Sequence, residues 1–202
     1  SSNLPAAAIF TRTANALRVP ATLLYRTDDE DAADVTVVCS SPPVVVLGPR
    51  LCRLGADAVP DEELRFLLGR AAEMVRPDTV IAAGLPFEEL QAFMSAIEGA
   101  FGSGPEDDEA KQLKTTLPIR TRKPLAELVG RATGADLDPA SYVAAVERKA
   151  DRAGYLVCGD AELSLRLAEA RGAREGVRHL VEVALKGELI EARAALGVGV
   201  LR

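Results

Sequence analysis

The chain has 202 residues, of which 48% are hydrophobic and 27% charged, and its formal net charge is -6. This balance is typical of a chain that buries its own core. The negative charge argues against a general nucleic-acid or anionic-membrane surface, and aromatic residues, at 4%, are too few for a base-stacking platform. No run is long and apolar enough to span a bilayer, and no signal peptide is visible. We therefore expect a cytoplasmic protein.

The first part of the chain predicts one helix and three short strands. The alanine-rich stretch Pro5–Val19 favours a helix that Pro20 ends. Runs rich in β-branched residues follow at Ala21–Arg26, Asp34–Ser40 and Pro43–Gly48. Acidic and proline-rich breaks separate them, which favours antiparallel neighbours. Because prolines flank the third run, we expect it at an edge of the sheet.

The stretch Pro60–Arg76 predicts the helix around which the rest of the chain is organised. Pro60 suits its first turn, acidic residues follow where the helix dipole favours them, and Pro77 ends it. Apolar residues at helical spacing form one buried stripe, made of Leu64, Leu67, Leu68, Ala71 and Val75. Further helices are expected at Pro86–Phe101, Glu106–Thr116, Lys123–Thr133, Ala140–Val157, Asp160–Arg171, Arg174–Lys186 and Glu188–Leu196.

A run of strands followed by many helices is the pattern of an α+β protein. We expect one domain over residues 1–202. Residues 5–48 would form the N-terminal helix and a small antiparallel or mixed sheet, and residues 49–202 a mostly helical body. The order argues against a parallel Rossmann-type sheet.

Residues for common catalytic chemistries are scarce. A metal hydrolase gathers several imidazole, carboxylate or thiolate ligands, but the sequence has a single histidine, His179, and three separated cysteines, Cys39, Cys52 and Cys158. The cysteines are interpreted as small buried hydrophobes in a reducing compartment. Neither a phosphate-binding loop nor a serine-nucleophile motif occurs. We expect no metal, no cofactor and no enzymatic activity.

Two segments nevertheless resemble a known active site. The order VVVLGPRLCRL, then PDEELRFLLG, is similar to that of M48-like metallopeptidases, the gluzincin group of zincins, whose HExxH helix follows a small sheet. At the family's two histidine positions stand Arg70 and Met74, and at the general-base position stands Ala71. The later segment ERKAD, Glu147–Asp151, is similar to the family's ExxAD, whose glutamate is the third zinc ligand. The resemblance covers roughly residues 20–160.

The substitutions decide what this resemblance implies. Arginine stays protonated and cannot ligate zinc, methionine is a poor ligand for zinc, and alanine cannot move a proton. The resemblance therefore implies a zincin-like body without its metal. We predict that the guanidinium of Arg70 takes the place of the metal's charge and pairs with Glu147. The alternative is that Arg70 points to solvent and Glu147 pairs with a helix neighbour such as Arg148.

Three functions remain open. The first is a non-catalytic module that binds a peptide or protein segment along an edge strand. Its candidate site residues are Val44, Val45, Val46, Leu47, Arg70, Met74, Glu147 and Asp151. The second is a scaffold module of a larger bacterial protein, with the former cleft filled. The third is a metal-independent enzyme that uses Arg70, Glu147 or Cys158.

Two charged stretches have a binding interpretation and a plainer one. The acidic stretch Asp28–Asp34 could hold calcium, but it lacks the glycine and terminal glutamate of a calcium loop, which favours a solvated hairpin turn. The basic run Ile119–Pro124 could contact an acidic partner, but such runs are more often a solvated helix entry.

Overall fold

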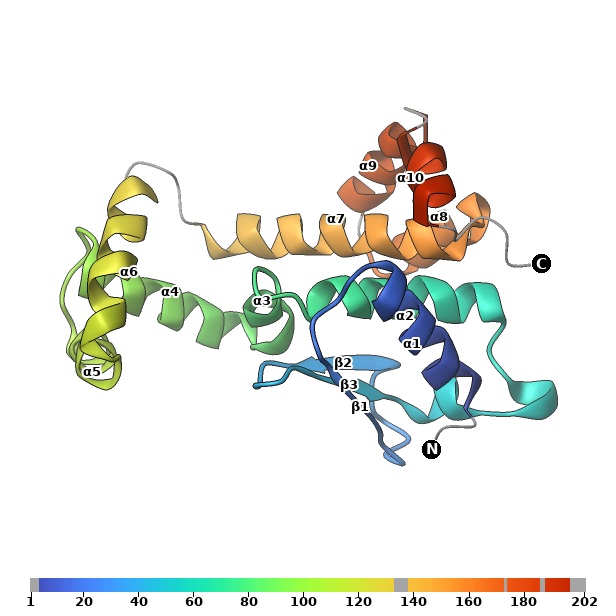
Figure 1. The fold of residues 1–202 in the computed structure, drawn as a ribbon, viewed down its shortest axis with the longest axis horizontal. Helices are drawn as coiled ribbons and strands as arrows, with labels where there is room; N and C mark the ends of the chain where they lie inside the picture. Colours follow the sequence, from blue (N-terminus) through green and yellow to red (C-terminus); the bar gives the residue numbers. More distant parts are fainter. Residues whose placement is uncertain (1–3, 133–137, 173, 186–187, 197–202) are drawn as a thin grey trace. The chain divides into compact units, whose positions relative to one another are not determined.

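The structure is a computed structural model and describes residues 4–132, 138–172, 174–185 and 188–196. It has the expected α+β organisation, with three strands near the N-terminus followed by helices (Figure 1). The chain, expected as one domain, divides into two compact units. The first combines Ser1–Gly84 with Ala144–Arg202, and the second is Leu85–Val143.

The first unit joins the sheet to helices from both ends of the chain. Its N-terminal elements are α1 (Pro5–Ala16), β1 (Leu23–Arg26), β2 (Val35–Val38), β3 (Val44–Leu47), the 3-10 helices η1 (Pro49–Cys52) and η2 (Gly55–Asp57), α2 (Asp61–Met74) and α3 (Val80–Gly84). Its C-terminal elements are most of α7 (Pro139–Cys158), then α8 (Ala161–Ala170), α9 (Arg174–Leu185) and α10 (Glu188–Leu196).

The sheet is mixed, with the order β1-β3-β2. β3 pairs in parallel with β1 and antiparallel with β2, so Val44–Leu47 is the central strand. The expectation that this run lies at an edge was wrong. The flanking prolines stand outside the paired residues and remove no ladder bond, and the carbonyl of Pro43 even accepts a bond from the Leu23 N–H at 2.9 Å.

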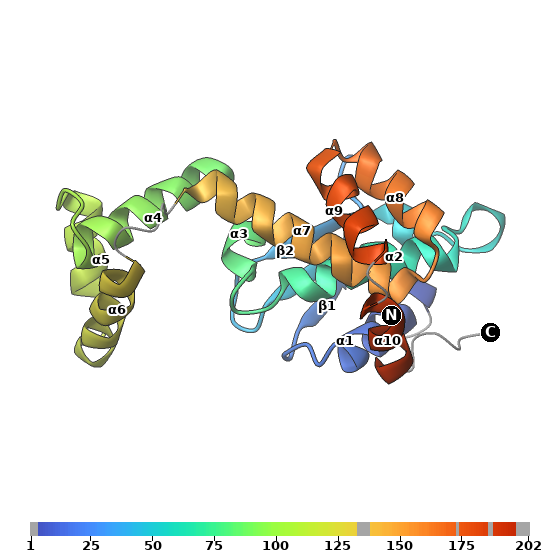
Figure 2. The same cartoon turned by 90° about the horizontal axis from the view of Figure 1, so that it is seen from above.

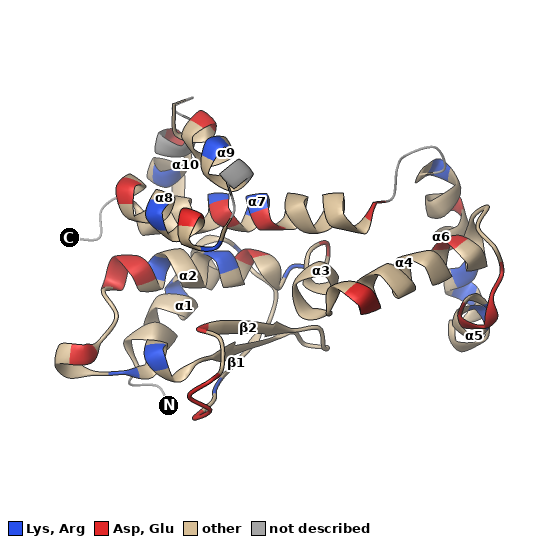
Figure 3. Ribbon diagram, turned by 180° about the vertical axis from the view of Figure 1, so that it is seen from behind, with Lys and Arg blue, Asp and Glu red and all other residues tan. Residues whose placement is uncertain are grey.

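The same strand order corrects two further expectations. Only β2 is an antiparallel neighbour of β3, because β1 runs parallel to it. The acidic stretch Asp28–Asp34 joins β1 to β2, which do not pair, so it is not a hairpin turn (Figure 3). Its Asp34 is held by Arg50, whose Nε and Nη2 donate to the carboxylate at 2.8 and 2.6 Å.

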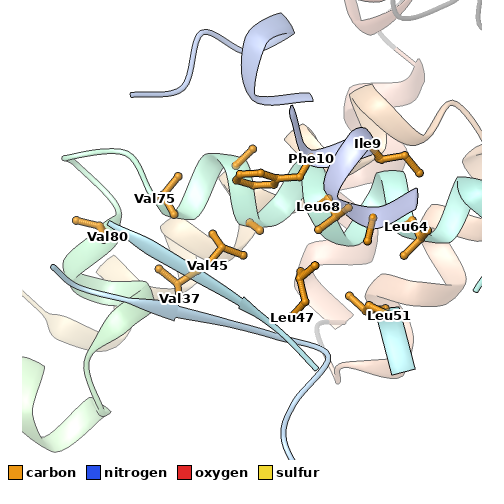
Figure 4. Close-up of a cluster of buried hydrophobic side chains, with 13 residues drawn as sticks. Ile9, Phe10, Val37, Val45, Leu47, Leu51, Leu64, Leu68, Val75 and Val80 are labelled. Atoms are coloured by element: carbon orange, nitrogen blue, oxygen red, sulfur yellow. The ribbon is translucent and has the colours of Figure 1, made fainter. Parts of the chain in front are cut away.

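One face of the sheet packs on α1 and α2 and forms the main core (Figure 4). Val37, Val45 and Leu47 point into it from the strands. Ile9 and Phe10 of α1, Leu64 and Leu68 of α2, and Val75 directly after α2 help to complete it. The alternation of strand side chains puts the next residues, such as Thr36, on the opposite, exposed face.

Helix α2 is central to the first unit, as the sequence predicted. It runs from Asp61 to Met74, slightly shorter than the expected Pro60–Arg76, and carries three acidic residues in its first turn. Leu68 faces the sheet core, whereas the fully buried Phe66 belongs to a second cluster with Cys158, Ala168 and Leu180. The helix is therefore buried on two sides.

α7 lies against α2 (Figure 2). The two helices touch at a pair of glycines, Gly69 and Gly154. A Cβ on Gly69 would lie 2.9 Å from the Gly154 Cα, and a Cβ on Gly154 would lie 2.7 Å from the Phe66 carbonyl oxygen. No side chain fits at either position without moving a backbone. This close approach brings the polar side chains of the two helices together.

The second unit is a small helical assembly of α4 (Phe87–Phe101), α5 (Asp108–Thr116) and α6 (Ile119–Ala132), in which α4 packs against both others. Asp107 caps α5 by accepting the Ala110 N–H at 2.8 Å. α6 begins at Ile119, before the expected Lys123, so the basic run forms its first turns. None of the described helices is long and apolar enough to cross a membrane.

Candidate functional site

Arg70 on α2 is a buried cation with a partner on α7. Its side chain is 8% exposed, and its Nη2 donates to Oε2 of Glu147 at 2.5 Å. The predicted pair is therefore confirmed, and the solvent-facing alternative for Arg70 is wrong. The helical turn between Glu147 and Asp151 puts both carboxylates on the face of α7 that meets α2.

Asp151 lies beneath this pair and holds two guanidinium groups. Nη1 of Arg70 forms an ion pair with its Oδ1, and Nη2 of Arg171 donates to the same oxygen. Its side chain is only 1% exposed. We call Arg70, Glu147, Asp151 and Arg171 the arginine–carboxylate cluster. The two positive and two negative charges of this cluster sum to zero.

Arg171, which the sequence analysis did not identify, follows the last turn of α8. Its Nη1 donates to the Leu167 carbonyl at 3.0 Å, and its guanidinium carbon lies 5.3 Å from the centre of the Phe66 ring. A cation over an aromatic face is a favourable contact. No sequence motif pointed to Arg171, because its partner Asp151 lies 20 residues earlier, on α7.

Burial sets the electrostatics of the cluster. Loss of hydration lowers the pKa of Arg70. The Glu147 carboxylate acts in the opposite direction and raises this pKa, whereas the nearby positive charge of Arg171 lowers it further. Burial also lowers the pKa of Arg171, again against the pull of Glu147. Both guanidinium groups nevertheless stay protonated in a protein. The carboxylates thus compensate cations that would be costly to bury alone.

These residues do not fit a zinc ion. Arg70 and Met74, one turn apart on α2, line a common cavity, and neither is a suitable zinc ligand. Glu147 is already engaged by the guanidinium of Arg70. Across the described parts of the chain, no three His, Cys, Asp or Glu side chains are grouped so that they could hold a metal ion.

A cavity of about 630 Å³ lies over α2 in the first unit. Its lining comes from β2 and the residues before it, from α2, α3, α7 and α8, and from Arg50 and Arg171. Arg50 is neutralised there, because it pairs with Asp34 and lies 2.8 Å from Glu63. Its hydrogen bond with Asp34 is the largest of the effects that raise its pKa. The volume is in the range of ligand pockets, roughly 300–1,000 Å³.

One wall of the cavity is the outer edge of β2, since residues 33–37 contribute to the lining. The Gly48 N–H donates to the Asp34 carbonyl at 2.8 Å. In an antiparallel pair every second residue bonds to the partner strand, so the main-chain groups of Asp34 and Thr36 face β3. The main-chain groups of Val35 and Val37 must then point away from β3. Within the described residues these groups have no hydrogen-bond partner.

The predicted site residues divide into two groups. Arg70, Met74 and Glu147 line the cavity, whereas Asp151 is buried below them and Val44–Leu47 contributes nothing to the lining. The strand that does line the cavity is β2, which was expected as a strand but not as part of the site. Cys158 is buried, and burial raises the pKa of its thiol, so it is a packing residue.

Comparison of the chain with known protein families, with curated proteins and with solved structures finds no match.

Proposed function

We propose that this chain is a non-catalytic module that binds an extended peptide, or an extended segment of a protein, by adding it as a strand to the outer edge of β2. The observation that carries the proposal is the open edge at Val35 and Val37 beside a cavity. Main-chain hydrogen bonds to such an edge give affinity, and adjacent pockets select side chains.

The cavity also weighs against the other two functions. A scaffold with a filled cleft would not keep about 630 Å³ of space beside an unpaired strand edge. A metal-independent enzyme would need a free acid, base or nucleophile, but each ionisable group of the lining is already engaged in an ion pair. Binding needs none of these groups to react.

We further propose that the module derives from an M48-like metallopeptidase body. In support, Arg70 and Met74 stand one turn apart on α2, and the Glu147 carboxylate from α7 meets the first of them. The resemblance predicts this arrangement for a site whose two histidines have been replaced. An edge strand beside that helix would then keep its peptide-binding role after the loss of catalysis.

The test uses a series of short peptides of alternating threonine and valine, acetylated and amidated, whose central residue is phenylalanine, leucine, serine, aspartate or lysine. Fluorescence polarisation should detect binding to the full chain. Val35→Pro deletes an N–H that points outward and should weaken binding about tenfold, since one hydrogen bond and close approach are lost.

The matched control is Leu24→Pro in β1. Leu24 is half-buried against the same core as Val35, and its main-chain groups point away from β3 at the opposite edge of the sheet. This variant should bind peptides like the parent chain. Equal loss in both variants, or no binding of any peptide to a folded parent chain, would overturn the proposal.

A further inference from the structure

The charged side chains around the cavity are already paired and offer no free partner to a charged ligand. Arg50 is paired with Asp34 and Glu63, and the arginine–carboxylate cluster balances its own charges. A bound ammonium or carboxylate would have to break one of these pairs or stay buried without a partner, which is costly. The electrostatics therefore favour a neutral group.

The rest of the helix-side lining is apolar, and more than half of these residues are alanines. It consists of Leu67, Ala71 and Met74 from α2, Ala82 and Ala83 from α3, and Leu167 and Ala170 from α8. Alanines keep the walls short, so the space between these helices and β2 is left for the ligand. Ala71, next to Arg70 on α2, brings no polar group to the part of the lining that it forms.

The side chains of β2 show which way a bound side chain would point. Val37 is buried toward α1 and α2, and Val35 packs against the same core. In a strand added to this edge, alternate side chains would point to the same side of the sheet. They would enter the cavity from β2 and meet its alanine-lined walls.

From these observations we infer that the site selects a peptide with a large apolar side chain, such as leucine or phenylalanine, which fills the space over Ala71 between β2, α3 and α8. This inference rests on the proposed strand addition and specifies its ligand class. The chain then recognises extended hydrophobic segments by one side chain and by main-chain bonds, and charged central residues are excluded.

The peptide series described above tests this selection. Phenylalanine or leucine at the centre should bind about tenfold or more tighter than serine, aspartate or lysine, because a large apolar side chain leaves water. Equal affinity across the series, still lost in Val35→Pro, would keep the strand addition and overturn the inference. A preference for a charged central residue would overturn it as well.

A pair of variants on α8 locates the selected side chain. Ala170→Trp fills the cavity wall and should remove the preference for the large apolar residues. Ala161→Trp adds the same side chain to an exposed position of α8 outside the lining and should leave the preference intact. An unchanged preference in a folded Ala170→Trp variant would place the selection elsewhere. If no peptide binds the parent chain, the proposed function fails, and this inference with it.

Discussion

The guanidinium of Arg70 and the carboxylate of Glu147 lie 2.5 Å apart, although 77 positions separate them in the chain. The glycine contact between α2 and α7 makes this meeting possible, and Asp151 completes it from below. The pair belongs both to the interface of the two helices and to the wall of the cavity. We therefore expect the same residues to influence stability and, under the proposed function, peptide binding.

Asp151 should matter more for stability than Glu147. Asp151→Ala leaves two buried or half-buried guanidinium groups short of a partner, and we expect a loss of about 3–5 kcal/mol of unfolding free energy. Glu147 is 43% exposed, so Glu147→Ala should cost about 1 kcal/mol or less. Urea denaturation followed by circular dichroism measures both. Equal losses would contradict the assignment of Asp151 as the buried anchor.

The close contact at Gly69 predicts that a glycine-to-alanine substitution has opposite effects on stability at Gly69 and at Gly130. Gly69→Ala should destabilise the chain by about 1–3 kcal/mol, because its Cβ would meet the α7 backbone, even though alanine favours a helix. Gly130→Ala on α6 has nothing within 4 Å of the new Cβ and should stabilise by up to about 1 kcal/mol. Thermal unfolding distinguishes them. A stable Gly69→Ala variant would mean that α2 and α7 do not touch.

The cysteines should differ in reactivity. The expectation that the cysteines are buried is confirmed for Cys158 but wrong for Cys39, which is exposed. Burial raises the pKa of the Cys158 thiol. A disulfide reagent near pH 8 should modify Cys39 quickly and Cys158 only after unfolding. Rapid modification of Cys158 in the folded chain would revive the enzyme hypothesis.

The raised pKa of Cys158 also gives a pH dependence. Burying the neutral thiol contributes stability that is fully present below the ordinary thiol pKa and is lost as the pH rises through the raised value. Above about pH 9 the unfolding free energy of the parent chain should therefore fall more steeply than that of Cys158→Ala. Parallel pH profiles would show that the thiol ionises freely in the folded chain.

The resemblance to M48-like metallopeptidases can be tested by restoring the replaced residues. In the variant Arg70→His, Ala71→Glu, Met74→His, two imidazoles one turn apart would face Glu147, and we expect stoichiometric zinc by plasma mass spectrometry. The parent chain should bind none. Adding Glu147→Ala to the variant should abolish stoichiometric binding. A folded triple variant without zinc would contradict the proposed descent.

The sequence predicted the features that depend on local signals. Proline and acidic residues mark the start of α2, and its apolar spacing predicts its buried stripe. Asp138, just before α7, likewise caps that helix by accepting the Ser141 N–H at 2.9 Å. The Arg70–Glu147 pair could be predicted because the resemblance to M48-like metallopeptidases brings these two positions together.

Strand order and the remaining site residues depend on tertiary contacts. The prolines around Val44–Leu47 favoured an edge position, but β3 lies between β1 and β2. No local sequence feature of the three strands indicates this order. For the same reason the open edge at Val35 and Val37 was not recognised. Arg171 reaches Asp151 because the chain turns back between α7 and α8. No pattern in the sequence predicts the direction of that turn.

The most direct test of the central claim is amide hydrogen exchange in β2, measured by NMR with and without the leucine-centred peptide. In the free chain the amides of Val35 and Val37 should exchange quickly, whereas that of Thr36, bonded to β3, should be protected. The peptide should protect Val35 and Val37 and leave Leu24 unchanged. Amides of Val35 and Val37 that are already as protected as Thr36 in the free chain, or that do not respond to a bound peptide, would contradict strand addition at this edge.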